Sequence, residues 1–360
     1  MKLDIPALIA LLVTLTVCLN ARFIGERFNV MAMPDKRKRH ARPTPQVGGL
    51  AILSGLAVWL IGRLFLDGFA TEPLLLAELL ATGGLALVGF IDDQREISPV
   101  LRILLVLAFT GIALAMDPKL IATHLTWYSF ASTPVAVWVY YPLIGVTALG
   151  LVNSVNMADG QNGLVGGMFV TWAACLMFVT QGTLAAMAGL LLVLGLLFLA
   201  FNLRSKMFLG DCGSYGVTFA IGLMAMQAYS QGYVALETII VWFFVPVMDC
   251  VRLLITRPLQ GRSPFSGGRD HFHHRLIDSF GIHFSALIYV GVVAGSSLVV
   301  TLAPRFSLLT LCALCGFYFS FARLSEGLGS QSSQPRPAGE GDVASANVVP
   351  LKDKTRHGHS

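Results

Sequence analysis

Long apolar runs recur along the whole chain, and they constrain the fold more than any other feature. Runs of about 20 residues, the length that a helix needs to cross a bilayer, lie near 5–24, 47–66, 74–91, 99–116, 134–152, 164–180, 184–201, 215–230, 234–255, 284–303 and 306–322. Of the 360 residues, 55% are hydrophobic and 12% are charged, which is about half the charged fraction of soluble domains. The sequence therefore predicts an all-α, polytopic membrane helical bundle with about eleven transmembrane helices.

Basic residues between the predicted spans indicate the topology. Lys and Arg gather in the connections after odd-numbered spans, whereas the even-numbered connections hold little beyond Lys119 and Arg305. Because an excess of Lys and Arg marks the cytoplasmic side, the N-terminus is predicted to be periplasmic and the C-terminus cytoplasmic. Residues 1–324 are expected to form the integral membrane domain with its cytoplasmic loops. Residues 325–360, rich in Ser, Gly and Pro, are expected to form a disordered cytoplasmic tail.

Every polar sequence whose side chains could bind a ligand or take part in catalysis falls in an odd-numbered connection. These sequences are PDKRKRHARPTPQVGG (34–49), GFIDDQREISP (89–99), NSVNMADGQNGL (153–164), NLRSKMFLGDCGSYG (202–216) and GRSPFSGGRDHFHHRL (261–276). Connections on one face of a helical bundle can converge. Because all these sequences lie in odd-numbered connections, this parity predicts a single site on the cytoplasmic face. The net charge of +5 is interpreted as this topology signal, and no nucleic-acid partner is expected.

Oxygen-bearing side chains are the candidates for metal binding and proton transfer. Asp92 and Asp93 are adjacent carboxylates at the end of a predicted helix, and their mutual repulsion suggests a cation or a proton-transfer role. Asn156 and Asp159 share a face if their segment is helical, and Asp211 lies between glycines. Hard cations such as Mg²⁺ take oxygen ligands and keep waters and substrate phosphates. The alternative for each residue is a cap or a turn.

A basic cluster follows the ninth predicted span. It holds His271, His273, His274, Arg262, Arg269 and Arg275. Binding of a phosphate or a sugar fits this cluster better than zinc, because the Cys residues and paired-His spacing of zinc sites are missing. The alternative is that the arginines only set the topology, and this interpretation is favoured for Arg257 and Arg275.

Carboxylates, a divalent cation and basic groups on one membrane face indicate transfer of a phosphoryl or phosphosugar group to a lipid. No Walker A or G-x-G-x-x-G sequence occurs, which excludes nucleotide hydrolases of those kinds. The alternative class is a transporter or flippase, which would place ionisable groups near the membrane midplane. The position of the carboxylates at predicted helix ends favours the transferase.

Taken together, the motifs resemble the polyprenyl-phosphate N-acetylhexosamine-1-phosphate transferase family. The resemblance is carried by the acidic pair Asp92–Asp93, by NxxNMxDGxxGL at Asn153–Leu164, by GDxGS at Gly210–Ser214 and by HxHH at His271–His274. RKxHxxPxPxxGG at 37–49 also matches. The form of the histidine motif is similar to that of the bacterial undecaprenyl-phosphate GlcNAc-1-phosphate transferases.

The resemblance implies a reaction in the bacterial inner membrane, with the active site on the cytoplasmic face. Undecaprenyl phosphate would attack the β-phosphorus of a UDP-N-acetylhexosamine, with GlcNAc as the default sugar, and UMP would be released. The lipid-linked product would start a cell-surface glycan such as O-antigen. The resemblance also implies Mg²⁺, with Mn²⁺ as the alternative, and it is compatible with a homodimer.

Roles carried over from the family divide the candidate residues into three groups. Asn156 and Asp211 would hold the metal ion, and Asp92, Asp93 and Asp159 would serve catalysis. The substrate-binding residues would be Arg102, Asn162, Arg269, His271, His273 and His274. Relatives often have a phosphate-facing Lys at the position of Arg102, and Arg keeps the charge there but changes the geometry.

Overall fold

The structure is a computed structural model, and it describes residues 4–34, 42–67, 73–263, 268 and 270–332. Its long elements are α1 (Ile5–Leu19), α3 (Gly48–Asp67), α5 (Gly83–Gln94), α6 (Pro99–Met116), α7 (Val137–Ala158), α8 (Leu164–Val179), α9 (Gly182–Asn202), α10 (Gly210–Ser230), α11 (Leu236–Leu259), α12 (Phe272–Leu302) and α13 (Ser307–Ser332). Shorter helices are α2 (Ala21–Arg27), α4 (Pro73–Ala77), the π-helix η1 (Glu78–Thr82), and the 3₁₀ turns η2 (Pro118–Leu120) and η3 (Pro304–Phe306).

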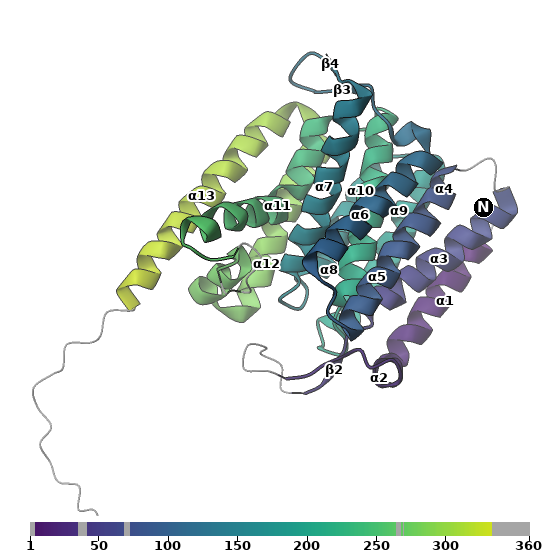
Figure 1. Cartoon of the computed structure of the whole chain (residues 1–360), viewed down its shortest axis with the longest axis horizontal. Helices are drawn as coiled ribbons and strands as arrows, with labels where there is room; N and C mark the ends of the chain where they lie inside the picture. Colours follow the sequence, from purple (N-terminus) through teal and green to yellow (C-terminus); the bar gives the residue numbers. More distant parts are fainter. Residues whose placement is uncertain (1–3, 35–41, 68–72, 264–267, 269, 333–360) are drawn as a thin grey trace, which may run out of the picture.

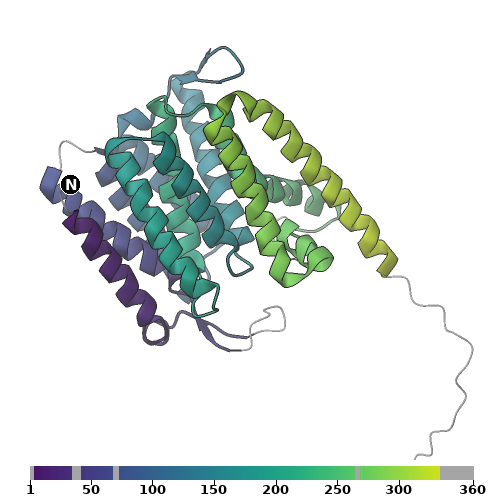
Figure 2. The same ribbon diagram turned by 180° about the vertical axis from the view of Figure 1, so that it is seen from behind.

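Two short antiparallel hairpins complete the described chain. One pairs β1 (Met31–Ala32) with β2 (Thr44–Pro45), and the other pairs β3 (His124–Leu125) with β4 (Thr133–Pro134). Figures 1 and 2 show them at opposite ends of the helical bundle. The predicted boundary of the tail at residue 325 falls inside α13, and residues 333–360 lie outside the described residues.

Each of the eleven predicted apolar runs contains a helix, so the prediction of a polytopic, mostly helical membrane protein is confirmed. Among the described residues, eight helices are long and apolar enough to cross a membrane, and the pair α1–α2, bent by 70°, would give a ninth. The helix α8 has only 16 residues, and α10 is not among the candidate spans. The number of spans and the orientation of the termini stay predictions.

The helix α10 lies at the centre of the bundle, where it contacts α3, α5, α7 and α8. Most of its residues are buried, including small ones such as Gly213 and Ser214. A Cβ atom at Gly213 would lie 2.6 Å from the Cα of Gly49, so the backbones of α3 and α10 are in direct contact. Protein surrounds α10, and it therefore does not need the apolar surface of a lipid-facing helix.

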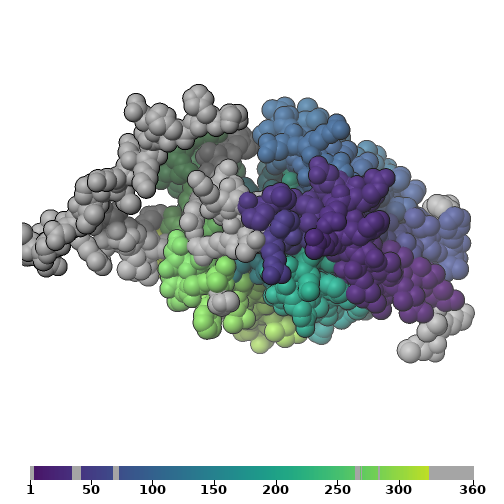
Figure 3. Space-filling model, turned by 90° about the horizontal axis from the view of Figure 1, so that it is seen from below, coloured from purple at the N-terminus to yellow at the C-terminus, as the bar shows by residue number. Residues whose placement is uncertain are grey.

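One end of the bundle, here called the polar end, holds Gln46, Asp93, Asp159 and Asp211. Backbone hydrogen bonds join its segments, since Phe208 N donates to Pro45 O (2.8 Å) and Gly48 N donates to Phe208 O (2.9 Å). Figure 3 views this end, where segments coloured from purple to green lie side by side. Connections that are far apart in the sequence thus converge there, as the parity of the connections predicts.

The other end, here called the opposite end, carries the β3–β4 hairpin. Glu237, at the start of α11, accepts the backbone N–H groups of Tyr128 and Ser129, both at 2.9 Å. This carboxylate fixes the loop that connects α6 to α7. A second carboxylate, Glu78, is fully buried in η1 and accepts a hydrogen bond from Thr82 Oγ1 (3.0 Å). Glu78 is not among the residues predicted from the sequence, although a carboxylate in a span is itself a signal.

Candidate active site

The site is built around the first turn of α10. Gly210 has a φ of +75°, a conformation that glycine adopts without the steric cost borne by other residues. A Cβ atom at this position would lie 2.7 Å from Asp93 Oδ2 and 2.9 Å from Gln46 O. The glycine of the GDxGS motif therefore lets α5 and the β2 segment approach the start of α10.

Asp93 caps α10 from a different helix. Its Oδ1 accepts the N–H of Asp211 (2.9 Å) and the Nε2–H of Gln46 (3.2 Å), while its Oδ2 accepts the N–H of Cys212 (3.0 Å). The first N–H groups of a helix have no intrahelical acceptor, and the positive end of the helix dipole favours a carboxylate. Asp93 thus positions Asp211, and its predicted catalytic role stays a prediction.

The two predicted metal ligands are in contact. Asn156, near the end of α7, donates through Nδ2 to Asp211 Oδ1 (2.7 Å) and to Ser214 Oγ (2.9 Å). Because its NH₂ group points to these acceptors, the amide carbonyl oxygen points to the other side, where it can face a cation. The GDxGS and NxxNMxDG motifs therefore meet at one place.

Asp159 follows the last residue of α7 and is partly buried. Loss of hydration, together with the neighbouring Asp211 carboxylate, raises the pKa of Asp159 to about 7. Asp93 lies within electrostatic reach of both. A cation bound among these groups would relieve their repulsion.

The oxygen atoms of this cluster suit Mg²⁺ better than a metal ion whose ligands must all come from the protein. Among the described residues, no group of three His, Cys, Asp or Glu side chains stands close enough to hold a metal ion. Mg²⁺ usually takes one or two carboxylates and fills its other positions with water and substrate phosphate. One carboxylate (Asp211) and one amide oxygen (Asn156) meet that requirement.

The structure separates the two adjacent aspartates. Asp92 is buried and accepts hydrogen bonds from Ile97 N (2.8 Å), Arg102 Nη2 (2.6 Å) and Tyr215 Oη (2.7 Å). The Arg102 guanidinium also lies 5.4 Å from the centre of the Tyr215 ring. Arg102 is thus paired with Asp92, and its predicted role in phosphate binding is untested. Tyr215, which directly follows the GDxGS motif, is not among the site residues predicted from the sequence.

Asn162 joins two loops of the polar end by hydrogen bonds. Its Nδ2 donates to Ser205 Oγ (2.8 Å), and Asn202 Nδ2 donates to its Oδ1 (3.3 Å). Asn202 Oδ1 also accepts the N–H of Gly163 (2.7 Å), whose φ is +82°. These contacts place Asn162 in a network between loops, and its predicted role in substrate binding stays a prediction.

A second cluster of ionisable residues holds the start of α12. Asp249, buried in α11, accepts hydrogen bonds from Phe272 N (3.1 Å) and Arg252 Nη2 (2.9 Å) through Oδ1, and its Oδ2 lies 3.1 Å from His271 Nδ1. Tyr318 Oη donates to the same carboxylate (2.9 Å). Asp249 is not among the site residues predicted from the sequence, although its position in an apolar run, three residues before an arginine, is a signal for such a role.

His273 connects the two clusters. A Cβ atom at Gly160 would lie 2.6 Å from His273 Nε2, so this ring lies against the loop that contains Asp159. Burial, and then the neighbouring His274 and His271 rings, lowers the pKa of His273 to about 3. The rings of His273 and His274 have centroids 4.2 Å apart. Arg269, predicted to bind substrate, lies outside the described residues.

Several known proteins are similar to this chain. The model of "Glycosyl transferase family 4" matches residues 75–229. The chain is 29% identical over 270 residues, 71% of each chain, to the "Undecaprenyl-phosphate alpha-N-acetylglucosaminyl 1-phosphate transferase" of Escherichia coli (strain K12). It is 25% identical over 308 residues, 82% of each chain, to the "Probable undecaprenyl-phosphate N-acetylglucosaminyl 1-phosphate transferase" of Bacillus subtilis (strain 168).

A mycobacterial protein is also similar. The chain is 26% identical over 355 residues, 84% of each chain, to the "Decaprenyl-phosphate N-acetylglucosaminephosphotransferase" of Mycobacterium tuberculosis (strain ATCC 25618 / H37Rv). The chain is thus similar to glycosyl transferase family 4, as the resemblance of its motifs predicted. The match to the family model includes both aspartates of the pair and the Asn156–Asp211 contact, whereas the histidine cluster lies beyond its end.

Two arginines near the histidine cluster have structural partners that the topological interpretation did not foresee. Arg257 is 1% exposed and donates to both carboxylate oxygens of Asp270, through Nε (3.1 Å) and Nη2 (2.8 Å). The Arg257 guanidinium holds the pKa of Asp270 well below its usual range. Arg275 Nη1 donates to Ala322 O (2.8 Å) in α13. Both arginines thus fix the segment around His271 in addition to the topological role that the sequence favoured, and that topological role stays a prediction.

Proposed function

We propose that this protein transfers N-acetylglucosamine 1-phosphate from a UDP-sugar to a polyprenyl phosphate, undecaprenyl phosphate being the expected acceptor, and releases UMP. The observation that carries the proposal is the Asn156–Asp211 contact at the capped start of α10, with Asp159 beside it. Its position at the polar end of apolar helices would let a water-soluble donor and a lipid acceptor reach the same site. The names of the three relatives support a polyprenyl phosphate acceptor and an N-acetylglucosamine phosphate group, and the UDP part of the donor is a proposal.

The reaction exchanges one phosphoanhydride bond for another. A phosphate oxygen of the acceptor attacks the β-phosphorus of the donor, and the bond from that phosphorus to the oxygen of the α-phosphate breaks. A phosphomonoester has a second pKa near 6, so the acceptor is already mostly a dianion at neutral pH. The site therefore has to neutralise charge more than it has to remove a proton.

Asp211 and Asn156 would hold Mg²⁺, with Mn²⁺ as the alternative. The bound ion would neutralise charge on the diphosphate. Asp93 would keep Asp211 in place through the start of α10, and Asp159 is a partly buried carboxylate within electrostatic reach of Asp211. In this arrangement Asp159 is the better candidate for a direct contact with substrate, because Asp92 is occupied by Arg102 and Tyr215.

The histidine cluster would bind the sugar-diphosphate. Asp249 fixes the orientation of the His271 ring, and burial keeps His273 neutral, so His273 would act as a hydrogen-bond partner and not as a cation. His274 lies beside it. Asn162, Arg102 and Arg269 complete the proposed substrate-binding set.

The polar end would face the cytoplasm, where nucleotide sugars are made, and the Lys and Arg excess in the odd-numbered connections supports that orientation. The membrane would be the bacterial inner membrane. The lipid-linked product would start a surface glycan such as O-antigen, and a homodimer is compatible with the proposal.

The proposal is tested with purified protein, undecaprenyl phosphate, Mg²⁺ and a panel of UDP-N-acetylhexosamines. UMP release that requires the lipid, together with a lipid product of the expected mass, is the predicted result. The variant Asp211→Asn should abolish turnover, whereas the matched variant Asp67→Asn, an exposed carboxylate at the end of α3, should not. Absence of UMP from every donor would refute the proposal.

A further inference from the structure

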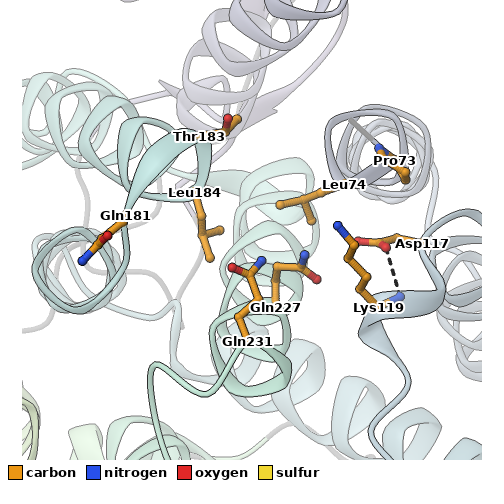
Figure 4. A pocket seen from close by; sticks show the side chains of 9 residues that line it. All are labelled: Pro73, Leu74, Asp117, Lys119, Gln181, Thr183, Leu184, Gln227 and Gln231. Carbon is orange, nitrogen blue, oxygen red and sulfur yellow. Dashed lines mark hydrogen bonds between the residues drawn. The ribbon is translucent and has the colours of Figure 1, made fainter. Parts of the chain in front are cut away.

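A polar cavity of about 200 Å³ lies at the opposite end of the bundle. Figure 4 shows its lining, which comes from the start of α4, the segment from the end of α6 into η2, the start of α9 and the end of α10. The polar side chains are Asp117, Lys119, Gln181, Thr183, Gln227 and Gln231. A single water needs roughly 10–15 Å³ of such space, so the cavity can hold a much larger guest.

Two buried oxygen atoms in this lining have no hydrogen-bond partner in the described part of the chain. They are Asp117 Oδ2 and Gln227 Oε1, on side chains whose residues are 1% and 3% exposed. The other oxygen of Asp117 accepts the N–H of Lys119 (3.1 Å), which fixes the orientation of the carboxylate. Buried polar atoms are nearly always hydrogen-bonded, so the cavity offers acceptors that need donors from a guest.

The chemistry of the lining selects the class of guest. Asp117 and Lys119 carry opposite charges, and they are the only charged side chains in the described lining, so a neutral guest leaves the charges balanced. Gln181, Gln227 and Gln231 can each donate and accept, and an amide can turn to present either end. Hydroxyl groups also donate and accept, whereas an ammonium ion only donates.

We infer that this cavity is a binding site for a neutral polyhydroxylated ligand of about the size of a sugar ring. Leu74 and Leu184 supply apolar surface for the carbon face of such a ring. The ligand could be a free sugar or the uncharged sugar head group of a membrane lipid, since both present the same hydroxyl groups.

This site is distinct from the transferase site. Asp211 and Gln227 lie on the same helix, sixteen positions apart, which corresponds to roughly 24 Å along the helix axis. The cavity lies at the end away from the polar loops, so neither the donor nor its diphosphate would enter it from the active site.

The test uses the full-length protein in lipid nanodiscs. In the first arm, methyl β-D-glucoside is titrated and its binding is followed by ligand-observed NMR. In the second arm, the thermal midpoint is measured in nanodiscs with and without a monoglucosyl diacylglycerol. Saturable binding of the glucoside, or a raised midpoint with the glycolipid, is expected, and the arm that responds identifies the source of the ligand.

Four variants locate the binding. Gln227→Leu keeps the size but removes the acceptor, and Asp117→Asn keeps the shape but replaces the Oδ2 acceptor, so each should weaken binding about tenfold or more. Gln260→Leu, at an exposed position, and Asp211→Asn, in the active site, should bind as the wild type does. If Gln227→Leu does not fold, Asp117→Asn decides. No response in either arm, or undiminished binding by a folded cavity variant, would overturn the inference.

Discussion

The ion pair Arg257–Asp270 predicts which of two substitutions lowers the free energy of unfolding more, because its two side chains differ in burial. The Arg257 side chain is 2% exposed and the Asp270 side chain 23% exposed, and Arg262 Nη1 also approaches Asp270 at 3.3 Å. Asp270→Asn therefore leaves a buried guanidinium without its carboxylate. Arg257→Met leaves a carboxylate that water and Arg262 can still reach.

Breaking a buried ion pair from one side costs about 3–5 kcal/mol of unfolding free energy. We expect Asp270→Asn to cost about 3 kcal/mol, at the lower limit of that range because Asp270 is partly hydrated. Arg257→Met should cost about 1–2 kcal/mol, which is closer to the value of a charged hydrogen bond at a partly exposed site. In the double variant the loss should be smaller than the sum by about 1–2 kcal/mol, because both changes remove the same interaction.

The assay is equilibrium unfolding in mixed detergent micelles, followed by tryptophan fluorescence for the wild type, both single variants and the double variant. Arg262→Met, at a more exposed position, is the control and should change stability by about 0.5 kcal/mol or less. A larger loss for Arg257→Met than for Asp270→Asn would contradict the reasoning from burial. Strict additivity would show that the two side chains are not coupled.

Three further predictions concern the polar end. Gly210→Ala should lower the free energy of unfolding by about 1–2 kcal/mol, because alanine is strained in the left-handed conformation of this position. It should also lower kcat by more than this loss explains, since the added Cβ would push against Asp93 and Gln46. An unchanged kcat would contradict the positioning of Asp211 by these residues. Asp93→Asn should weaken Mg²⁺ activation, seen as a higher Mg²⁺ concentration for half-maximal rate, whereas an unchanged titration would remove Asp93 from the support of the metal site. The pKa of His273 is lowered from 6.5 to about 3, so between these pH values the unfolded chain takes up a proton and the folded protein does not. The free energy of unfolding is therefore unaffected by His273 above pH 6.5 and decreases as the pH drops towards 3. The decrease at pH 5.5 should be about 1.4 kcal/mol. Thermal unfolding at pH 7.5 and pH 5.5 should show this decrease in the wild type and not in His273→Phe.

The helices and the convergence of the polar connections could be predicted from the sequence. Apolar runs have a length set by the bilayer, and the parity of the basic connections places their polar residues on one side. The contact between Asn156 and Asp211, which are 55 positions apart, follows from the motifs only through the resemblance to a family. Its geometry depends on the capping of α10 by Asp93, which no local pattern specifies.

The roles of paired charges could not be predicted, because a sequence does not show which charges are buried. Arg257 has the sequence context of an ordinary arginine at the end of a span, yet it is buried against Asp270. Likewise, Asp92 and Asp93 are neighbours in the chain, but their side chains have different partners, Arg102 and Tyr215 for one and the start of α10 for the other. Tertiary packing decides these assignments.

The central claim is that the bond to the β-phosphorus is exchanged, and the fate of that phosphorus tests it most directly. The purified protein is incubated with undecaprenyl phosphate, Mg²⁺ and UDP-N-acetylglucosamine that is radiolabelled in the β-phosphate. The account predicts that the label appears in the lipid product together with the sugar, and that the released nucleotide is unlabelled UMP. Label recovered in UDP, with the sugar alone on the lipid, would contradict it.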